Sequence, residues 1–177
     1  MYDYYISLGD NCEIGLQLRR IGYEQSSFFR FTASPFNSTY QIIENDFQNV
    51  FLSENLVPRV CNNLETIMVR DTRYDIGIHA RLPYVKNDNG KKIFIKNMDF
   101  MAAYDREYSK IKYFIEKWHS LINSEKKVLY LIKAAENTSR SNAEKLLDLF
   151  SRKYPNHQFD LAYLQLEEYR EPDWKIP

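Results

Sequence analysis

The most restrictive feature of the sequence is a near-continuous apolar segment, KKVLYLIKA, at residues 126–134. Such a run is typical of a buried strand in a parallel sheet. Residues 3–8 and 159–168 have the same strand-like character. A helical pattern at 12–21 follows the strand at 3–8, and another at 138–154 follows the apolar segment at 126–134. Strands that alternate with helices predict a parallel sheet with right-handed crossovers and helices on its faces.

The middle of the chain predicts shorter strands and one long helix. Strands are expected at residues 64–71, 74–82 and 91–97, with the turn sequence Asn-Asp-Asn-Gly at 87–90 before the last of them. Apolar residues at spacings of three, four and seven then predict a helix over residues 98–122.

A further helix is expected over residues 39–51, capped by Asn37 or Ser38. Together these segments predict a single α/β domain over residues 1–177. The expected architecture is a three-layer Rossmann-like domain, with a mostly parallel sheet and a central antiparallel hairpin.

Charge and composition exclude several classes of function. Lys and Arg together number 24, as do Asp and Glu, so the formal net charge is zero and no basic footprint for nucleic acid is present. No apolar run reaches the roughly 18 residues that a membrane span needs. The N-terminus lacks the pattern of a signal peptide, so we expect a cytoplasmic protein in which Cys12 and Cys61 are both reduced.

The turn between the first strand and the first helix carries the strongest functional signal. It reads Gly9-Asp10-Asn11-Cys12, with glycine suited to a sharp turn and Asp10 or Asn11 suited to capping the helix. Cys12 would then lie in the first helical turn, where free N–H groups and the helix dipole stabilise a thiolate. This arrangement suits a nucleophilic cysteine or an anion-binding site, and it is equally compatible with a structural thiol beside an ordinary helix cap.

A thiolate nucleophile needs a base, and the chain has three histidines. His79 lies within the strand predicted at 74–82 and is the best candidate for a general base. His119 is expected on a helix surface, and His157 in an exposed polar turn. The sequence contains no metal-binding spacing and no Walker or G-x-G-x-x-G motif, so neither a metal nor a cofactor is expected.

The segment SLGDNCEIGLQLRRIG, residues 7–22, resembles a family of bacterial domains of unknown function named as papain-like cysteine peptidases. The likeness lies in Asn11-Cys12-Glu13-Ile14-Gly15 and in the FFRF segment at 28–31. It extends to the Ser34-Pro35-Phe36 segment. The resemblance implies that Cys12 is the nucleophile and that a downstream histidine is the base. It also implies a context of cell-surface polysaccharide biosynthesis.

Three functions are consistent with these observations. The first is a thiol-dependent hydrolase or transferase with Cys12 and His79 as catalytic residues, acting on a small-molecule, glycan or peptide substrate. The second is a non-catalytic domain that binds an anionic nucleotide-sugar or glycan, and the third is a module whose many aromatic residues cover a partner. The expected binding residues are those of the turn and two nearby arginines, namely Gly9, Asp10, Asn11, Glu13, Arg19 and Arg30.

Overall fold

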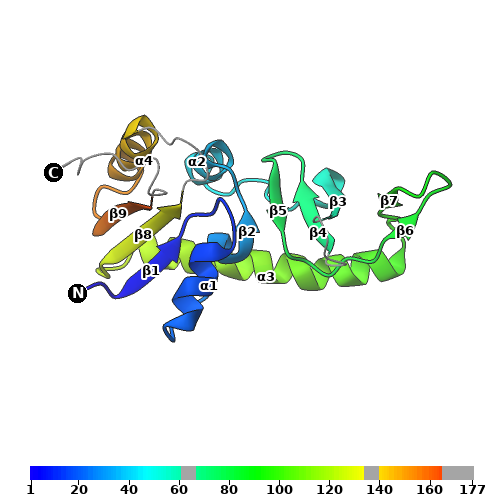
Figure 1. Cartoon of the computed structure of the whole chain (residues 1–177), viewed down its shortest axis with the longest axis horizontal. Coiled ribbons are helices and arrows are strands. Elements are labelled where there is room, and N and C mark those ends of the chain that lie inside the picture. The colour runs from blue at the N-terminus through cyan, green and yellow to red at the C-terminus, as the bar shows by residue number, and fades with distance from the viewer. Residues whose placement is uncertain (61–66, 134–139, 165–177) are drawn as a thin grey trace.

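The chain forms two main sheets that lie along one long helix (Figure 1). The structure, a computed structural model, describes residues 1–60, 67–133 and 140–164. Cys61, the first two residues of the helical pattern at 138–154 and the end of the expected strand, residues 165–168, lie outside the described residues. The structure is a mixed α/β fold, as the sequence predicts, whereas the three-layer Rossmann-like arrangement and the single domain over the whole chain stay predictions.

Sheet A is parallel and contains β1 (Tyr4–Ser7), β8 (Val128–Lys133) and β9 (Phe159–Leu164). Its order is β1-β8-β9, with Tyr4 opposite Val128 and Val128 opposite Phe159. The parallel pairing predicted from the apolar segments is therefore confirmed. Burial alternates along β8, because Val128, Tyr130 and Ile132 face the core while the residues between them are half-buried.

Sheet B is antiparallel and separate from sheet A, so the antiparallel strands in the middle of the chain form a sheet of their own and do not extend the parallel one. Its order is β2-β5-β4-β3, and β6 and β7 form a further hairpin. The bounds are β2 (Thr32–Ala33), β3 (Leu56–Val60), β4 (Ile67–Asp71), β5 (Ile76–Ile78), β6 (Val85–Lys86) and β7 (Lys92–Ile93). The physical reason is the short connection between β4 and β5, which permits antiparallel pairing only.

The long helix α3 (Met98–Ile122) has the bounds that the sequence predicts. Its first turn is capped by Asn97, whose side chain accepts a hydrogen bond from the backbone N–H of Phe100 at 2.9 Å. Near its start, the hydroxyl of Tyr104 donates to the carbonyl of Phe51 beside sheet B. Near its end, Trp118 packs against Tyr130 of sheet A, with ring centroids 5.7 Å apart. One helix thus provides the core contact for both sheets.

The shorter helices are α1 (Glu13–Arg20), α2 (Phe36–Glu44) and α4 (Arg140–Lys153), and the 3-10 turns are η1 (Phe28–Phe31) and η2 (Ser53–Asn55). Helix α2 corrects the expected capping, because it begins after Pro35 without a side-chain cap. It also ends early, since left-handed backbone conformations at Asp46, Phe47, Asn49 and Phe51 interrupt the helix. Phe47 and Phe51 are nevertheless buried, so core packing holds this loop in an otherwise costly conformation.

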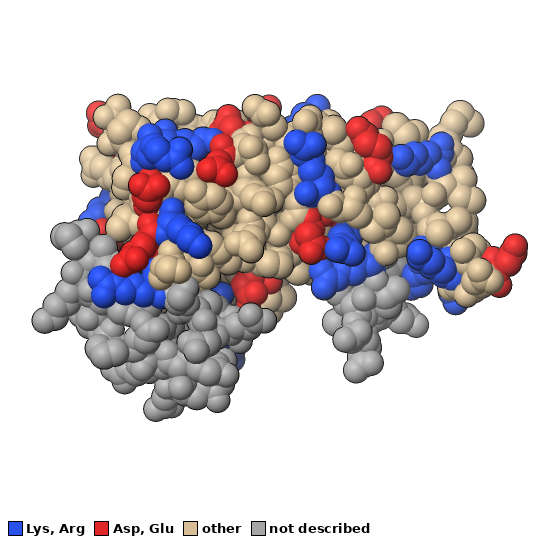
Figure 2. Space-filling view, turned by 90° about the horizontal axis from the view of Figure 1, so that it is seen from above, with Lys and Arg blue, Asp and Glu red and all other residues tan. Residues whose placement is uncertain are grey.

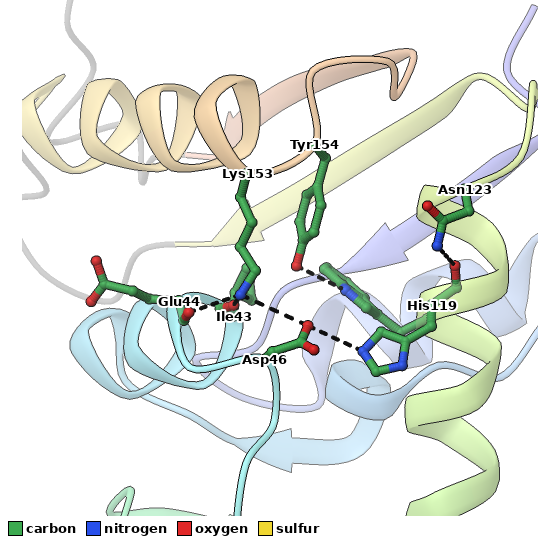
Figure 3. A network of polar contacts seen from close by, with 8 residues as sticks. Ile43, Glu44, Asp46, His119, Asn123, Lys153 and Tyr154 are labelled. Atoms are coloured by element: carbon green, nitrogen blue, oxygen red, sulfur yellow. Dashed lines mark hydrogen bonds and ion pairs between the residues drawn. The ribbon is translucent and has the colours of Figure 1, made fainter.

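A polar network at the end of α2 connects three helices (Figure 3). The ammonium group of Lys153 on α4 donates to the carbonyls of Ile43 and Glu44, at 2.7 and 2.8 Å. Asp46 lies 3.8 Å from that ammonium group and 3.1 Å from Nε2 of His119 on α3. These bonds satisfy carbonyls that have no partner within α2. His119 is partly exposed, as expected for a helix-surface residue.

His157 is buried, which corrects the expectation that it lies in an exposed turn. Its Nε2 is 2.9 Å from the hydroxyl of Tyr130, and its ring stacks on Phe159. Within the described parts of the chain its Nδ1 has no hydrogen-bond partner. Burial lowers the pKa of His157, because the charged imidazolium is poorly solvated there.

This burial predicts a pH-dependent stability. The pKa of His157 is below its ordinary value of 6.5 in the folded state, so the unfolded chain binds a proton more readily as pH falls below about 6.5. We expect the free energy of unfolding to fall with decreasing pH in this range, by at most about 1.4 kcal/mol per pH unit. His157→Gln should flatten the slope in urea titrations between neutral and mildly acid pH. Tyr130→Phe leaves His157 titratable and should keep the wild-type slope of stability against pH. Equal slopes in wild type and His157→Gln would contradict the assignment of this pH dependence to His157.

Candidate functional site

The turn after β1 has a strained backbone that the neighbouring chain holds in place. Gly9 has a φ of 101° and Asp10 a φ of 68°, both in the left-handed region. A Cβ atom on Gly9 would lie 2.8 Å from Cβ of Ser34 and 3.2 Å from Oγ1 of Thr39, so only glycine fits without displacement. The backbone N–H of Asp10 donates to the carbonyl of Ser34 at 2.8 Å, which fixes the turn against the segment after β2.

Two buried hydroxyl groups support this turn from below. Thr39 donates to the carbonyl of Leu8 at 2.9 Å, and the hydroxyls of Ser34 and Thr39 are 2.7 Å apart. Because the hydrogen of Thr39 points to Leu8, Ser34 is the donor in the second bond. Neither residue was among the predicted site residues. Ser34 does belong to the segment that carries the family resemblance, whereas nothing in the sequence distinguishes Thr39.

Cys12 occupies the N-cap position of α1, where β1 leads into the helix. Its thiol is free and partly exposed, and its carbonyl accepts the backbone N–H of Leu16 at 2.9 Å. The cap itself is provided by Asn11, whose side-chain oxygen accepts the backbone N–H of Glu13 at 2.9 Å. The predicted strand–turn–helix geometry is therefore present, with Asn11 rather than Asp10 bonded to the first helical N–H.

An ion pair that sequence reasoning missed lies beside the cysteine. The carboxylate of Glu13 pairs with the ammonium group of Lys133, which lies at the last position of β8. Both residues therefore lie at the carboxyl edge of sheet A, the edge at which ligands bind in parallel sheets. A cation at the carboxyl end of a predicted buried strand is a sequence signal that could have identified Lys133.

The two arginines predicted to bind an anion lie in different environments. Arg30 is 3% exposed, and its guanidinium donates to the carbonyls of Gln25, Tyr23 and Gly15, the last at 3.4 Å. Its hydrogen-bond donors thus hold the loop between α1 and η1. Arg19 lies in the last turn of α1, about 10 Å along the helix from Cys12, and is 4.0 Å from Glu24. The arrangement does not bring either guanidinium to the turn.

His79 is exposed and directly follows β5. It lines a small cavity of about 170 Å³ with Glu107 and Lys110 of α3, whose side chains form an ion pair at 2.8 Å. The residues that line this cavity do not include Cys12. The structure therefore groups His79 with a carboxylate and an amine of α3.

The described residues contain no cluster of three or more His, Cys, Asp or Glu side chains that could hold a metal ion. Among the helices in those same ranges, none has the length and apolar character to cross a membrane.

A parallel strand, a strained glycine turn and a cysteine at a helix N-cap define this chain as a thiol-bearing mixed α/β protein. Residues 3–164 match the family described as "Putative papain-like cysteine peptidase (DUF1796)", and the chain belongs to that family. Neither the curated proteins nor the solved structures give a significant match.

The close contacts of Gly9 predict a large effect of substitution. Gly9→Ala forces alanine into a left-handed conformation, which lowers the free energy of unfolding by about 1–2 kcal/mol. The clash of the new Cβ atom with Ser34 lowers it by about 1–3 kcal/mol more. Gly22 is a matched control, because its φ is also positive, at 83°, but nothing lies within 4 Å of its Cβ position. Chemical denaturation should show a larger loss of stability for Gly9→Ala than for Gly22→Ala. Equal losses would show that the turn is not held by Ser34.

Proposed function

We propose that this protein is a thiol-dependent hydrolase or transferase in which Cys12 is the nucleophile. The observation that carries the proposal is the partly exposed, free thiol of Cys12 at the start of α1, on the carboxyl edge of the parallel strands. Helix N-terminal N–H groups favour an anion there, which suits both a thiolate and a negatively charged intermediate. Membership of a family described as papain-like cysteine peptidases supports the same chemistry.

The reaction begins with attack of the Cys12 sulfur on a carbonyl carbon. A C–S bond forms as His79 takes the thiol proton, the C–N or C–O bond of the substrate breaks, and the leaving group takes that proton from the protonated His79. Water or an acceptor hydroxyl or amine then cleaves the thioester and regenerates the thiol. The substrate is accordingly a peptide, an ester or an acyl-bearing glycan.

Backbone N–H groups would stabilise the oxyanion that forms in this step. The N–H groups of Asp10 and Glu13 are engaged by Ser34 and by the Asn11 side chain. Within the described residues this leaves the N–H groups of Asn11 and Cys12 without acceptors. We assign these two groups to the oxyanion hole.

His79 is the general base in this proposal. It follows β5, whose residues Gly77 and Ile78 pair with Ala33 and Thr32 of β2. The next residue after β2, Ser34, contacts the turn that carries Cys12. In this antiparallel pair His79 comes opposite Phe31, three residues before Ser34 and therefore about 10 Å along the strand from it, and the proposal requires His79 to approach Cys12 when substrate binds.

Selective alkylation tests the nucleophile. In a Cys61→Ser variant, where Cys12 is the only thiol, iodoacetamide should label the folded protein faster than the urea-unfolded protein near neutral pH. The rate should fall as pH decreases, because the thiolate is the reacting species. Mass spectrometry of the labelled peptide gives the rate directly. Labelling that is slower in the folded state would identify Cys12 as a protected structural thiol.

Single and double variants test the catalytic pair. Cys12→Ser should lower kcat/KM for an activated ester by about a thousandfold or more, and His79→Ala by about a hundredfold or more. The double variant should be scarcely slower than Cys12→Ser, because residues that act as a unit are non-additive. Cys61→Ser and His119→Ala are the matched controls and should retain activity. Full activity in His79→Ala, with loss in Cys12→Ser, would remove His79 from the mechanism while retaining the nucleophile.

A further inference from the structure

A large groove separates the edge of sheet B from the hairpin β6–β7. It has a volume of about 860 Å³, in the range of small-molecule sites. Lys and Arg side chains gather at this end of the molecule, as the space-filling view shows (Figure 2). We call it the basic groove. Its cationic lining residues are Arg59, Arg70, Lys91, Lys92 and Lys96.

The strand register explains why the arginines face the groove. Val57 lies opposite Arg70, and Arg59 lies opposite Met68, so these side chains share the outer face of sheet B. A Cβ atom on Gly77 of β5 would lie 3.3 Å from Nη1 of Arg59. The absence of a side chain on Gly77 thus lets Arg59 extend over the sheet towards β5.

The opposite wall is the hairpin, whose turn is well defined. The side-chain oxygen of Asn87 accepts the backbone N–H groups of Asn89 and Lys91, at 3.2 and 2.9 Å. This turn places Lys91 and Lys92 at the start of β7, and the ammonium group of Lys92 lies 4.7 Å from the centre of the Tyr84 ring. Cations therefore line the basic groove from both sides.

Charge is strongly segregated in the basic groove. Among the described residues that line it, five cations face two carboxylates, Glu54 and Asp75, although the whole chain has no net charge. Asp75 is already paired with Arg70 at 2.7 Å. Among the residues that the structure describes, Arg59, Lys91 and Lys96 have no ion-pair partner. Like charges gathered around a concave surface repel one another, and a multivalent anion would remove that repulsion.

We propose that the basic groove binds an oligophosphate, either free or as the phosphate chain of a nucleotide. Guanidinium groups bind phosphate oxygens in a bidentate manner, and the lysines of the facing wall supply point charges. A chain of linked phosphates can contact Arg59 on one wall and Lys91 and Lys96 on the other. This site is on sheet B, does not use Cys12, and goes beyond the proposed thiol chemistry.

Calorimetric titration of the full chain with tripolyphosphate tests the proposal. Tripolyphosphate should bind more tightly than inorganic phosphate, and added salt should weaken it, since the groove is open to solvent. Arg59→Gln combined with Lys91→Gln should raise Kd by about tenfold or more. Arg59→Lys should have a Kd between those of the wild type and the double variant, because it keeps the charge but loses the bidentate guanidinium. Tighter binding of ADP than of pyrophosphate would identify a nucleotide, and equal binding a free oligophosphate.

Lys145→Gln is the matched control, because Lys145 is exposed on α4, which packs against sheet A, and does not line the groove. It should change Kd by less than about twofold, as expected for a distant, screened surface charge. Absence of tripolyphosphate binding, or equal weakening by Lys145→Gln, would overturn the proposal. Tighter binding of a hexaglutamate peptide would also overturn it in favour of an acidic protein partner. Cys12→Ser should leave Kd unchanged, so the outcome is independent of the proposed catalytic function.

Discussion

The packing of α3 against both sheets is the constraint on which the rest of the structure depends. A helix of 25 residues is about 37 Å long, enough to reach from the hairpin to the parallel strands (Figure 1). Phe100 and Tyr104 occupy its sheet B end, and Trp118 its sheet A end, all of them buried. The two sheets share no strand, so the relation between the Cys12 turn and the basic groove is set mainly by this helix and by the segment at residues 28–36.

That segment connects the parts of the site. Its buried Arg30 binds the loop after α1, and the carbonyl of Arg30 would lie 2.3 Å from a Cβ atom on Gly15, so helix and segment are in direct backbone contact. A few residues later Ser34 holds the Gly9 turn, and Pro35 lines the basic groove. The cysteine turn and the groove are therefore attached to neighbouring positions of one rigid piece of chain, although they belong to different sheets.

The sequence predicted the features that depend on local periodicity and failed where distant contacts decide. Helix α3, the parallel strands and the strand–turn–helix at Cys12 were predictable, because their apolar spacing and capping residues are local signals. The separation into two sheets was not, because strand pairing partners are not encoded locally. His157 is buried against Tyr130, which lies far from it in the sequence. Arg30 is buried because its guanidinium binds three backbone carbonyls. No recognisable sequence motif indicates either set of contacts. For the same reason the grouping of His79 with Glu107 and Lys110 required the structure.

The order of strands in sheet A has a consequence for how the protein matures during synthesis. The first strand, β1, pairs only with β8 in this sheet, and β8 comes more than 120 residues later. In a nascent chain that emerges N-terminus first, Ser34 and Thr39 can reach the Gly9 turn early, but β1 gains its partner β8 only after most of the protein has been translated. The helix N-terminus at Cys12 is local, whereas the Glu13–Lys133 ion pair beside the thiol is assembled only once β8 is in place. An incomplete chain therefore carries Cys12 without the ion pair and the neighbouring parallel strand that surround it in the finished protein.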